Sequence, residues 1–314
     1  MSFQDPPWLS VMTPIQLFMW TARALGRGAQ AMDFAIQRMT SRSTKAKVFA
    51  GYEPKPHDVF VTCFSKSGTN WTMQLVTQIC HRGAAEFEHI HQEVAWPESK
   101  FPGIVGLEDM GPVTRSAVGK RGLKTTIVAE FVPYSPVASY VTVLRDPKDV
   151  IVSAYDFLMG IFGLREHVDM PTWLELMLKP GGLIVEDWPA HTDGYWRMRD
   201  RPNVLVLEFA DMKRSLDDAV DAIAGLLGVE LTADERATVI ERGSFPYMKA
   251  HESQFGPPRL PLLTGRERGQ MIRAGKVGRS KQVLSEEQRE RIDALMLERL
   301  AQLGSDFPYR ERFM

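Results

Sequence analysis

The feature that most restricts the fold is a short strand pattern that runs through a glycine-containing loop into a helix. Residues 58–63 (DVFVTC) are rich in β-branched and aromatic side chains, which predicts a strand. The small polar loop at residues 65–69 leads into a helical pattern at residues 70–81. Glycine lets the backbone pass close to a ligand, and main-chain N–H groups at a helix N-terminus point at an anion. We therefore expect a P-loop-like phosphate loop after the first strand.

Similar patterns alternate along the rest of the chain. Short β-rich runs predict strands, and helical patterns separate them. The strands are expected at residues 123–128, 140–144 and 204–207, and the helices at residues 147–158, 188–199, 216–227 and 232–242, with a closing helix after Ser285. This order predicts an α/β fold, a single domain at residues 46–314 with a central, mostly parallel sheet flanked by helices. Residues 1–45 are expected to form an N-terminal amphipathic helical segment.

Charge and cysteine content exclude several classes of protein. Lys and Arg total 38 against 39 Asp and Glu, so there is no overall basic field of the kind that drives non-specific nucleic-acid binding. The two cysteines cannot form a disulfide framework, and no set of Cys and His residues has zinc-finger spacing. We expect no nucleic-acid partner, no metal and a reducing, cytoplasmic setting. An anionic ligand would need a local basic site.

The N-terminal region lacks the pattern of a secretory signal or a membrane span. Residues 1–10 carry an acid and two prolines where a signal would carry positive charge. Residues 13–39 are partly apolar, but charges and glycines interrupt them, so they lack the ~18 uninterrupted apolar residues of a spanning helix. We expect this segment to pack against the domain, and the alternative is peripheral contact with a membrane surface.

The glycine-containing loop has the residue types of an oxyanion site. Lys66 and the hydroxyls of Ser67 and Thr69 surround Gly68. Because Lys66 precedes Gly68 and no earlier glycine stands at the required spacing, the GxxxxGK[ST] loop of nucleotide triphosphatases is absent, which disfavours a kinase or ATPase. The competing interpretation is an ordinary strand-to-helix turn with a Ser or Thr cap.

A second candidate anion site follows the strand expected at residues 140–144. Arg145 ends this strand, and Asp146 and Pro147 then supply a helix cap and a proline at the first helical position. The helix carries Ser153. A bidentate guanidinium at the carboxyl end of a strand lies where open α/β sheets bind ligands. The alternative is a capped helix with a surface arginine.

These two segments, in this order, resemble the cytosolic sulfotransferases that use 3′-phosphoadenosine 5′-phosphosulfate (PAPS). The loop FSKSGTNW is similar to the family's 5′-phosphosulfate loop YPKSGTTW, and RDPKDVIVSAY is similar to its 3′-phosphate motif RNPKDVxVSxY. The resemblance implies that Lys66 contacts the sulfuryl group, that Trp71 packs near the adenine, and that the 3′-phosphate contacts Arg145 and Ser153. The implied donor-binding residues are Lys66, Ser67, Gly68, Thr69, Asn70, Trp71, Arg145, Ser153, Ser244, Phe245, Arg273 and Gly275.

The later matches of this resemblance depart from the family pattern in places. Ser244 and Phe245 match the family's T-S-F adenine contact. Arg273 and Gly275 match its R-K-G loop, in which Ala274 here replaces a lysine and so removes one cation. Residues 278–281 (GRSK) stand where the family has G-D-W-K, so we expect the cover over the nucleotide to pack differently.

The family's catalytic base has no match at its expected position. The resemblance places a His at the end of a K-T-H strand, where this chain has Lys124, Thr125 and Thr126. It assigns a catalytic role to Lys124, but a threonine hydroxyl does not accept a proton near neutral pH, so the base lies elsewhere or is lost. Our first candidate is Glu130, as a buried carboxylate with its pKa raised by an apolar pocket. Four extended residues span ~13 Å, so the loop would have to fold back.

Histidines supply further candidates. His191 matches the family's W-x-x-H-x-x-x-W-W helix and is expected to be structural. His89, His91 and Glu93 lie where family members line the acceptor pocket. The sequence HIHQE would suit a metal pair, but without a distant Cys or Glu set we expect a surface or pocket strand instead.

The resemblance implies an enzyme, a PAPS-dependent sulfotransferase in which lysines and backbone dipoles supply the positive field without a metal. Apolar residues around Trp96, Phe131 and 157–162 favour the hydroxyl of a small hydrophobic molecule as acceptor. The alternative is a non-catalytic homologue that binds PAPS or its product 3′-phosphoadenosine 5′-phosphate (PAP), because Thr126 stands at the base position. A homodimer is also compatible with the sequence.

Overall fold

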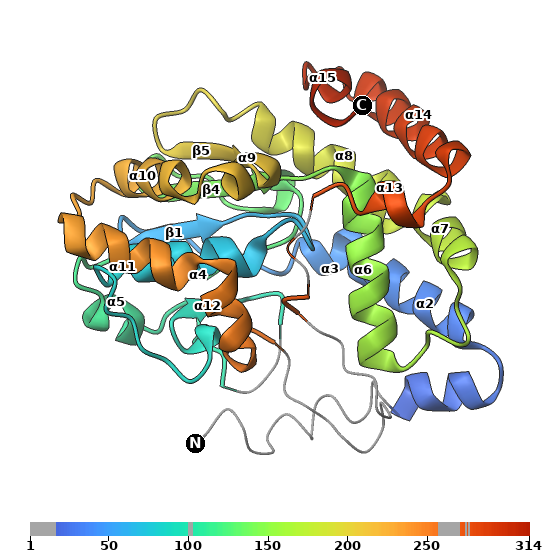
Figure 1. The fold of residues 1–314 in the computed structure, drawn as a ribbon, viewed down its shortest axis with the longest axis horizontal. Coiled ribbons are helices and arrows are strands. Elements are labelled where there is room, and N and C mark those ends of the chain that lie inside the picture. Colours follow the sequence, from blue (N-terminus) through green and yellow to red (C-terminus); the bar gives the residue numbers. More distant parts are fainter. Residues whose placement is uncertain (1–16, 100–102, 257–270, 274, 276) are drawn as a thin grey trace.

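The centre of the molecule is a five-stranded sheet. In the computed structural model, which describes residues 17–99, 103–256, 271–273, 275 and 277–314, the strand order is β2-β3-β1-β4-β5 and every pairing is parallel (Figure 1). The strands are β1 (Asp58–Val61), β2 (Val94–Ala95), β3 (Arg121–Lys124), β4 (Ser139–Leu144) and β5 (Val204–Glu208). Helices flank the sheet, so the predicted α/β fold with a central parallel sheet is confirmed.

Helices make up most of the remaining ordered elements. They are α2 (Gly28–Thr40), α3 (Arg42–Lys45), α4 (Thr69–Cys80), α5 (Gly111–Arg115), α6 (Pro147–Phe162), α7 (Met170–Leu178), α8 (Leu183–Trp196), α9 (Phe209–Arg214), α10 (Leu216–Leu227), α11 (Ala233–Gly243), α12 (Phe245–Ala250), α13 (Ser280–Val283), α14 (Glu286–Gln302) and α15 (Tyr309–Phe313), with short 3₁₀ helices η1 (Ile90–Gln92), η2 (Ala129–Phe131) and η3 (Glu252–Gln254).

The alternation of side chains along β1 explains the layers. Val59 and Val61 are fully buried in an apolar cluster with side chains of α4, α10 and α11, which cover one face of the sheet (Figure 1). Phe60 points to the opposite face and is stacked on Tyr140. Because both faces are covered, the strand is apolar at nearly every position, as parallel strands usually are.

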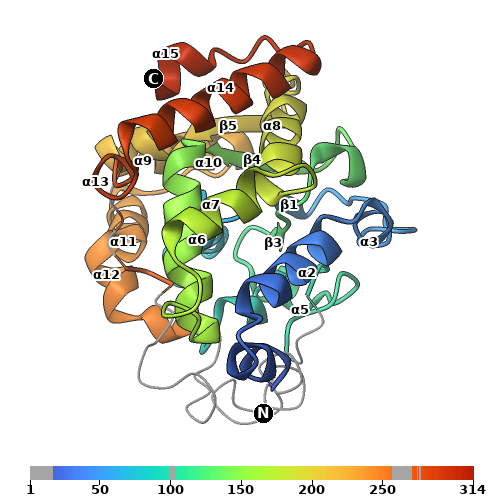
Figure 2. The same cartoon turned by 90° about the vertical axis from the view of Figure 1, so that its right-hand side faces the viewer.

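A third apolar cluster positions the helices that border the site. This cluster joins the helices α6, α7, α8 and α14 around Phe64 and Leu144. Phe64 lies in the loop after β1, and Leu144 is the last residue of β4. Helix α2 joins this group through its contacts with α7 and α8 (Figure 2). These helices therefore border one side of the carboxyl edge of the sheet, and the loops that follow the strands lie along the edge itself.

The differences from the predicted elements have local causes. Helix α10 has its predicted bounds, whereas the strand predicted at residues 123–128 forms as β3 and ends at Lys124. It ends there because the main-chain N–H of Thr126 bonds to the Glu98 carboxylate instead of a neighbouring strand, whereas the N–H of Thr125 still bonds to the Val61 carbonyl oxygen of β1. The two-residue strand β2 is too short to carry a pattern that predicts it.

The N-terminal segment lies against the domain. Residues 17–24 are helical, and Met19, Met32 and Ile36 of this segment are buried in the third cluster. A buried ion pair, with Lys45 Nζ 2.6 Å from Asp187 Oδ1, links α3 to α8. No helix within the described ranges is long and apolar enough to cross a membrane. The domain boundary after residue 45 stays a prediction.

Candidate active site

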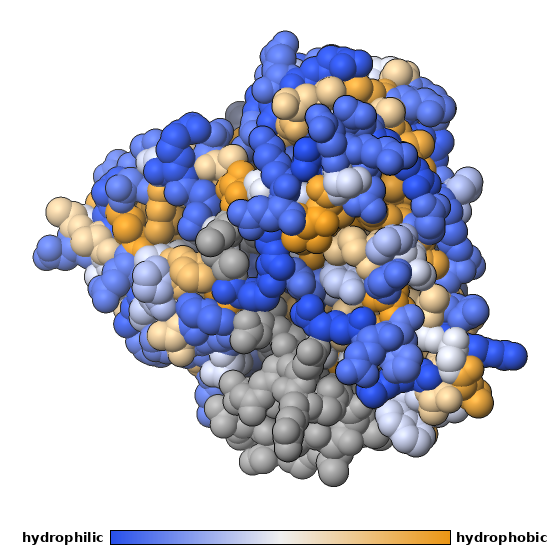
Figure 3. Space-filling model, turned by 45° about the vertical axis from the view of Figure 1, so that its right-hand side comes forward, coloured by the Kyte–Doolittle hydropathy of each residue, from blue (hydrophilic) through white to orange (hydrophobic). Residues whose placement is uncertain are grey.

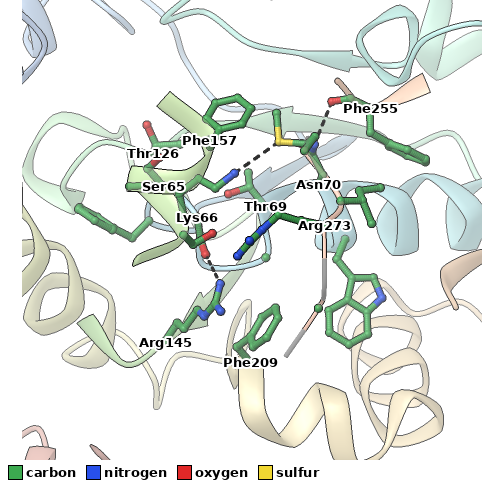
Figure 4. Close-up of a pocket in the computed structure, with 18 of the residues that line it drawn as sticks. Ser65, Lys66, Thr69, Asn70, Thr126, Arg145, Phe157, Phe209, Phe255 and Arg273 are labelled. Atoms are coloured by element: carbon green, nitrogen blue, oxygen red, sulfur yellow. Dashed lines mark hydrogen bonds between the residues drawn. The ribbon is translucent and has the colours of Figure 1, made fainter. Parts of the chain in front are cut away.

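A cavity of about 710 Å³ lies at the carboxyl edge of the sheet. Its walls come from the loop after β1, the ends of β3 and β4, helix α6 and the segment before α13. The predicted site residues that line it are Lys66, Gly68, Thr69, Asn70, Trp71, Lys124, Arg145, Ser153, Ser244, Phe245, Arg273 and Gly275. In Figure 4 the side chains of Lys66, Thr69 and Arg273 lie close together although they come from separate parts of the chain. The fold thus brings the predicted donor residues to one place.

The loop after β1 is held in a conformation that exposes its backbone to a ligand. Gly68 is the N-cap of α4 with φ 98°, and a Cβ there would lie 3.1 Å from Phe209 Cδ2, so glycine is required. Lys66 also has positive φ, and the guanidinium of Arg145 donates to its carbonyl oxygen at 2.7 Å. The helix N-terminus therefore faces the cavity as an anion site.

Two buried hydroxyls in this loop are unsatisfied. Ser67 Oγ and Thr69 Oγ1 have no hydrogen-bond partner among the residues that the structure describes. Thr69 lines the cavity, whereas the side chain of Ser67 is sealed beneath the loop. Buried polar groups are normally paired, so an oxyanion bound in the cavity would satisfy the Thr69 hydroxyl.

Three cations converge on the same end of the cavity. Burial, together with the nearby charges of Arg145 and Lys124, lowers the pKa of Lys66 to about 7. Burial likewise lowers the pKa of Lys124 to about 8, and its Nζ lies 3.4 Å from the centre of the Trp96 ring. Burial also lowers the pKa of Arg145, which lies 4.3 Å from the centre of the Phe209 ring. The field at this end strongly favours an anion.

The second predicted anion site is completed by the segment before α13. The Asp149 carboxylate on α6 accepts hydrogen bonds from the main-chain N–H groups of Gly278 and Ser280, at 2.8 and 2.9 Å. This anchors Arg279, whose guanidinium lies 3.1 Å from Asp156 Oδ2 and which lines the cavity. Sequence reasoning missed Arg279. Its only signal is the GRSK sequence itself, where an arginine stands in place of the family's aspartate.

The wall predicted to contact adenine is aromatic. The Trp71 indole donates to the Gly243 carbonyl oxygen at 2.7 Å and meets the Phe209 ring edge to face at 5.7 Å. Ser244 caps α12 by accepting from Tyr247 N, which fixes the direction of the helix that carries Phe245. These contacts hold flat apolar surfaces at the cavity wall, as a planar ring requires.

Glu130 does not take the buried position predicted for it. It lies on η2, its side chain is 57% exposed, and its carboxylate pairs with Arg42 outside the cavity. The reason is that η2 packs on α8. Ala129 of η2 lies so close to Gly194 of α8 that a Cβ added to Gly194 would be 2.9 Å from the Cβ of Ala129. The loop after β3 therefore turns away from the site, and the expectation of a buried Glu130 carboxylate is wrong.

Glu98 occupies the position beside the threonines instead, and no sequence pattern indicates it. Its Oε1 accepts from the main-chain N–H of Thr126 at 2.8 Å and from the hydroxyls of Thr126 and Thr125 at 3.1 and 3.2 Å. Its Oε2 accepts from the Trp96 indole at 2.7 Å. The carboxylate thus holds both Trp96 and the end of β3 in place.

The histidines separate into core and cavity groups. His191 is fully buried against Phe64 and Tyr195, and burial lowers its pKa to about 3, so it is part of the core as expected. His89 and His91 line the cavity, whereas Glu93 is buried outside it and pairs with the half-exposed Arg115. Across the described ranges, no group of three or more His, Cys, Asp or Glu side chains is placed to hold a metal ion.

The fold and site together define an α/β protein that binds a multiply charged anion at the carboxyl edge of a parallel sheet. Residues 56–304 match the sequence model of the family described as sulfotransferase domain. Sulfotransferase 2A1 of Macaca fascicularis is 26% identical over 284 residues, which cover 88% of this chain and 96% of the relative. The 3-alpha-hydroxysteroid sulfotransferase of Cavia porcellus is 27% identical and covers 79% of this chain and 85% of the relative.

Solved structures show the same fold. Retinol dehydratase in complex with retinol and PAP superposes with a TM-score of 0.64 at 20% identity, covering 85% of this chain and 88% of that one. A mouse sulfotransferase complexed with PAP gives a TM-score of 0.62 at 20% identity, covering 83% and 90%. The chain therefore belongs to the sulfotransferase family, and it is a PAPS-dependent sulfotransferase.

Proposed function

We propose that this enzyme transfers the sulfuryl group of PAPS to the hydroxyl of a small hydrophobic acceptor, without a metal. The observation that carries the proposal is the division of the cavity into a cationic end and an apolar remainder. The apolar walls include Phe157, Leu158, Ile161, Phe162 and Leu183. Relatives support this class of acceptor, since solved structures of retinol dehydratase hold retinol or androsterone together with PAP.

The residues present fit the charges of PAPS. The backbone of Gly68 and Thr69 at the start of α4 would hold the 5′-phosphosulfate, where the hydroxyl of Thr69 is unsatisfied. Arg145 and Ser153 would hold the 3′-phosphate, and Arg273 would contribute a further cation. When bound, PAPS supplies the activated sulfuryl group for the reaction.

The lysines have separate roles in the proposed reaction. Lys66 lies at the cationic end with its Nζ 3.9 Å from the centre of the Phe157 ring, where it would stabilise charge on the transferred group and the leaving phosphate oxygen. Lys124, beside Trp96, would orient the acceptor oxygen and neutralise charge that develops there. Water is restricted by the aromatic walls, which strengthens both interactions.

Binding of the product nucleotide should take up protons at pH 8. The pKa values of about 7 for Lys66 and about 8 for Lys124 mean that both amines are partly neutral at this pH before an anion binds. Adjacent phosphate favours the ammonium forms and raises both pKa values, so PAP binding should take up on the order of one proton. Calorimetry in buffers of different ionisation enthalpy measures the uptake, which should fall in Lys66→Met. Binding without proton uptake at pH 8 would contradict the buried, partly neutral lysines.

The acceptor class can be tested with a series of alcohols. Initial rates with a fixed PAPS concentration should show KM falling as the alcohol is lengthened or enlarged from short chains to sterols, because each added apolar group is removed from water in the cavity. Sugars with similar hydroxyl groups should be poor acceptors. Equal KM values across the series, or a preference for sugars, would refute the hydrophobic acceptor.

A second candidate function is binding of PAPS or PAP without catalysis. The observation that favours it is Thr126, which lines the cavity at the family's base position and whose hydroxyl donates to Glu98. A protein of this kind would bind PAP tightly and transfer sulfate to no alcohol or phenol.

A cytoplasmic setting, self-association and peripheral membrane contact also belong to the proposal. The membrane contact is supported by exposed apolar side chains on the N-terminal segment, namely Leu17, Phe18, Trp20, Leu25 and Phe34. Elsewhere the visible surface is largely hydrophilic, with hydrophobic side chains in separate groups (Figure 3). Sedimentation with anionic vesicles would test the contact.

A further inference from the structure

One histidine nitrogen opens on the cavity without a partner. His91 lies on η1, and its Nδ1 is 2.8 Å from the Val94 carbonyl oxygen. A carbonyl oxygen can only accept, so Nδ1 carries the proton and Nε2 holds a lone pair. Within the described part of the chain Nε2 has no hydrogen-bond partner, and it is not among the atoms sealed from solvent.

Two other candidate proton acceptors near His91, His89 and Glu98, already make hydrogen bonds. The Nδ1 of His89 accepts from the main-chain N–H of His91 at 3.3 Å, and its Nε2 lies 3.0 Å from the Gly256 carbonyl oxygen. The Glu98 carboxylate already accepts from Thr125, Thr126 and Trp96.

His91 also lies at the end of the cavity where the lysines converge. Its ring is stacked on the Trp96 ring with centres 5.3 Å apart, and the Nζ of Lys124 contacts the same indole. Thr126, at the position where the family carries its histidine, lines the same cavity and is tied to Trp96 through Glu98. An imidazole from η1 thus reaches the region from which the family's histidine is absent.

We propose that His91 is the general base of this enzyme and replaces the histidine missing at residue 126. This rests on the proposed function. The proton of the acceptor hydroxyl passes to Nε2 of His91 while the acceptor oxygen forms a bond to sulfur. The bond between sulfur and the bridging phosphate oxygen breaks, its electron pair stays on that oxygen, and PAP leaves with the negative charge. The imidazolium then loses its proton to solvent.

The ionisation of His91 suits an acceptor of protons. Burial lowers its pKa well below the usual value, and the charges of Lys124 on β3 and of His89 on η1 act in the same direction, against the opposing hydrogen bond to Val94. The imidazole is therefore neutral across neutral pH. The negative charge of a bound donor would raise the pKa of His91 again and so stabilise the imidazolium that forms when the proton is transferred.

The test compares two His91 variants with a matched control. Asn in His91→Asn can keep the hydrogen bond to the Val94 carbonyl but offers no basic nitrogen, and His91→Ala leaves room for added imidazole. The control is His251→Asn, because His251 makes the same kind of Nδ1 contact, 2.8 Å from the Tyr247 carbonyl oxygen, and does not line the cavity. PAP affinity, measured by calorimetry, should change little in all three and reports that the fold is intact.

The expected result is that both His91 variants lose turnover with an aliphatic alcohol by ~100-fold or more, the usual effect of removing a positioned base. The loss should be smaller with an acidic phenol, which needs less help to lose its proton, and imidazole should restore activity to His91→Ala alone. His251→Asn should transfer sulfate at the wild-type rate.

Wild-type turnover in His91→Asn would overturn the assignment and leave the proposed function standing. Equal losses on both acceptors without rescue by imidazole would also overturn it, since that pattern marks a structural role. If the wild-type chain binds PAP and transfers nothing to any acceptor, the proposed function itself fails, and the assignment of a base fails with it.

Discussion

Replacing Lys66 by methionine should lower turnover by roughly 100- to 1,000-fold, the range found when one donor to a developing charge is removed. Lys66 is buried and lines the cationic end of the cavity. Charge on the bridging oxygen grows as the bond to sulfur breaks, so the loss should fall on kcat more than on affinity for the donor. Initial rates at saturating PAPS and acceptor, with PAP affinity from calorimetry, separate these two effects.

Lys120→Met supplies the matched control for this prediction. Lys120 precedes β3 at the opposite edge of the sheet and donates to the Pro56 carbonyl oxygen, outside the cavity. It should keep wild-type rates. An unchanged kcat in Lys66→Met would remove Lys66 from the reaction, and equal losses in both variants would indicate a general effect of charge.

Arg145→Ala should weaken PAP binding by about 2–4 kcal/mol, which corresponds to roughly 30- to 1,000-fold in Kd. The Arg145 side chain is only 11% exposed, so its charge acts in a site with little screening. It also donates to the Lys66 carbonyl oxygen, so the substitution loosens the phosphate loop as well as removing a phosphate contact. Calorimetry with PAP and ADP should show that the variant loses most of its preference for the 3′-phosphorylated nucleotide.

The control for this substitution is Arg236→Ala. Arg236 forms a surface pair with Asp221, with Nε 2.7 Å from the carboxylate, and lies outside the cavity. Its loss should leave nucleotide affinity within about twofold, because exposed ion pairs contribute little. A wild-type chain that binds PAP and ADP equally well would contradict the assignment of Arg145 to the 3′-phosphate.

The donor half of the site could be predicted from the sequence because its determinants are local. The position of Gly68 at the start of α4 follows from the strand, loop and helix pattern around it. Arg145 directly follows the last residue of β4. Parallel strands bring their carboxyl ends together, so two motifs far apart in the chain must meet at one edge of the sheet. The positions of Lys66 and Ser153 follow from the same argument.

The acceptor half could not be predicted because it depends on contacts between distant segments. Glu130 lies outside the cavity because η2 packs on α8, and no local pattern encodes that contact. Glu98 accepts hydrogen bonds from Thr126, which follows the end of β3 and lies 28 residues after Glu98 in the chain. The hydrogen bond that orients His91 is local, but only the fold shows that its free nitrogen faces the cavity.

Incubating the chain with radiolabelled PAPS and a panel of sterols, phenols and long-chain alcohols tests sulfuryl transfer itself. We expect label in the product of at least one hydrophobic hydroxyl compound, with one PAP formed for each sulfate ester, in the presence of a metal chelator. Tight binding of PAP with no labelled ester from any member of the panel, in the wild-type chain and in Thr126→His alike, would contradict it and show a protein that binds the nucleotide without catalysis.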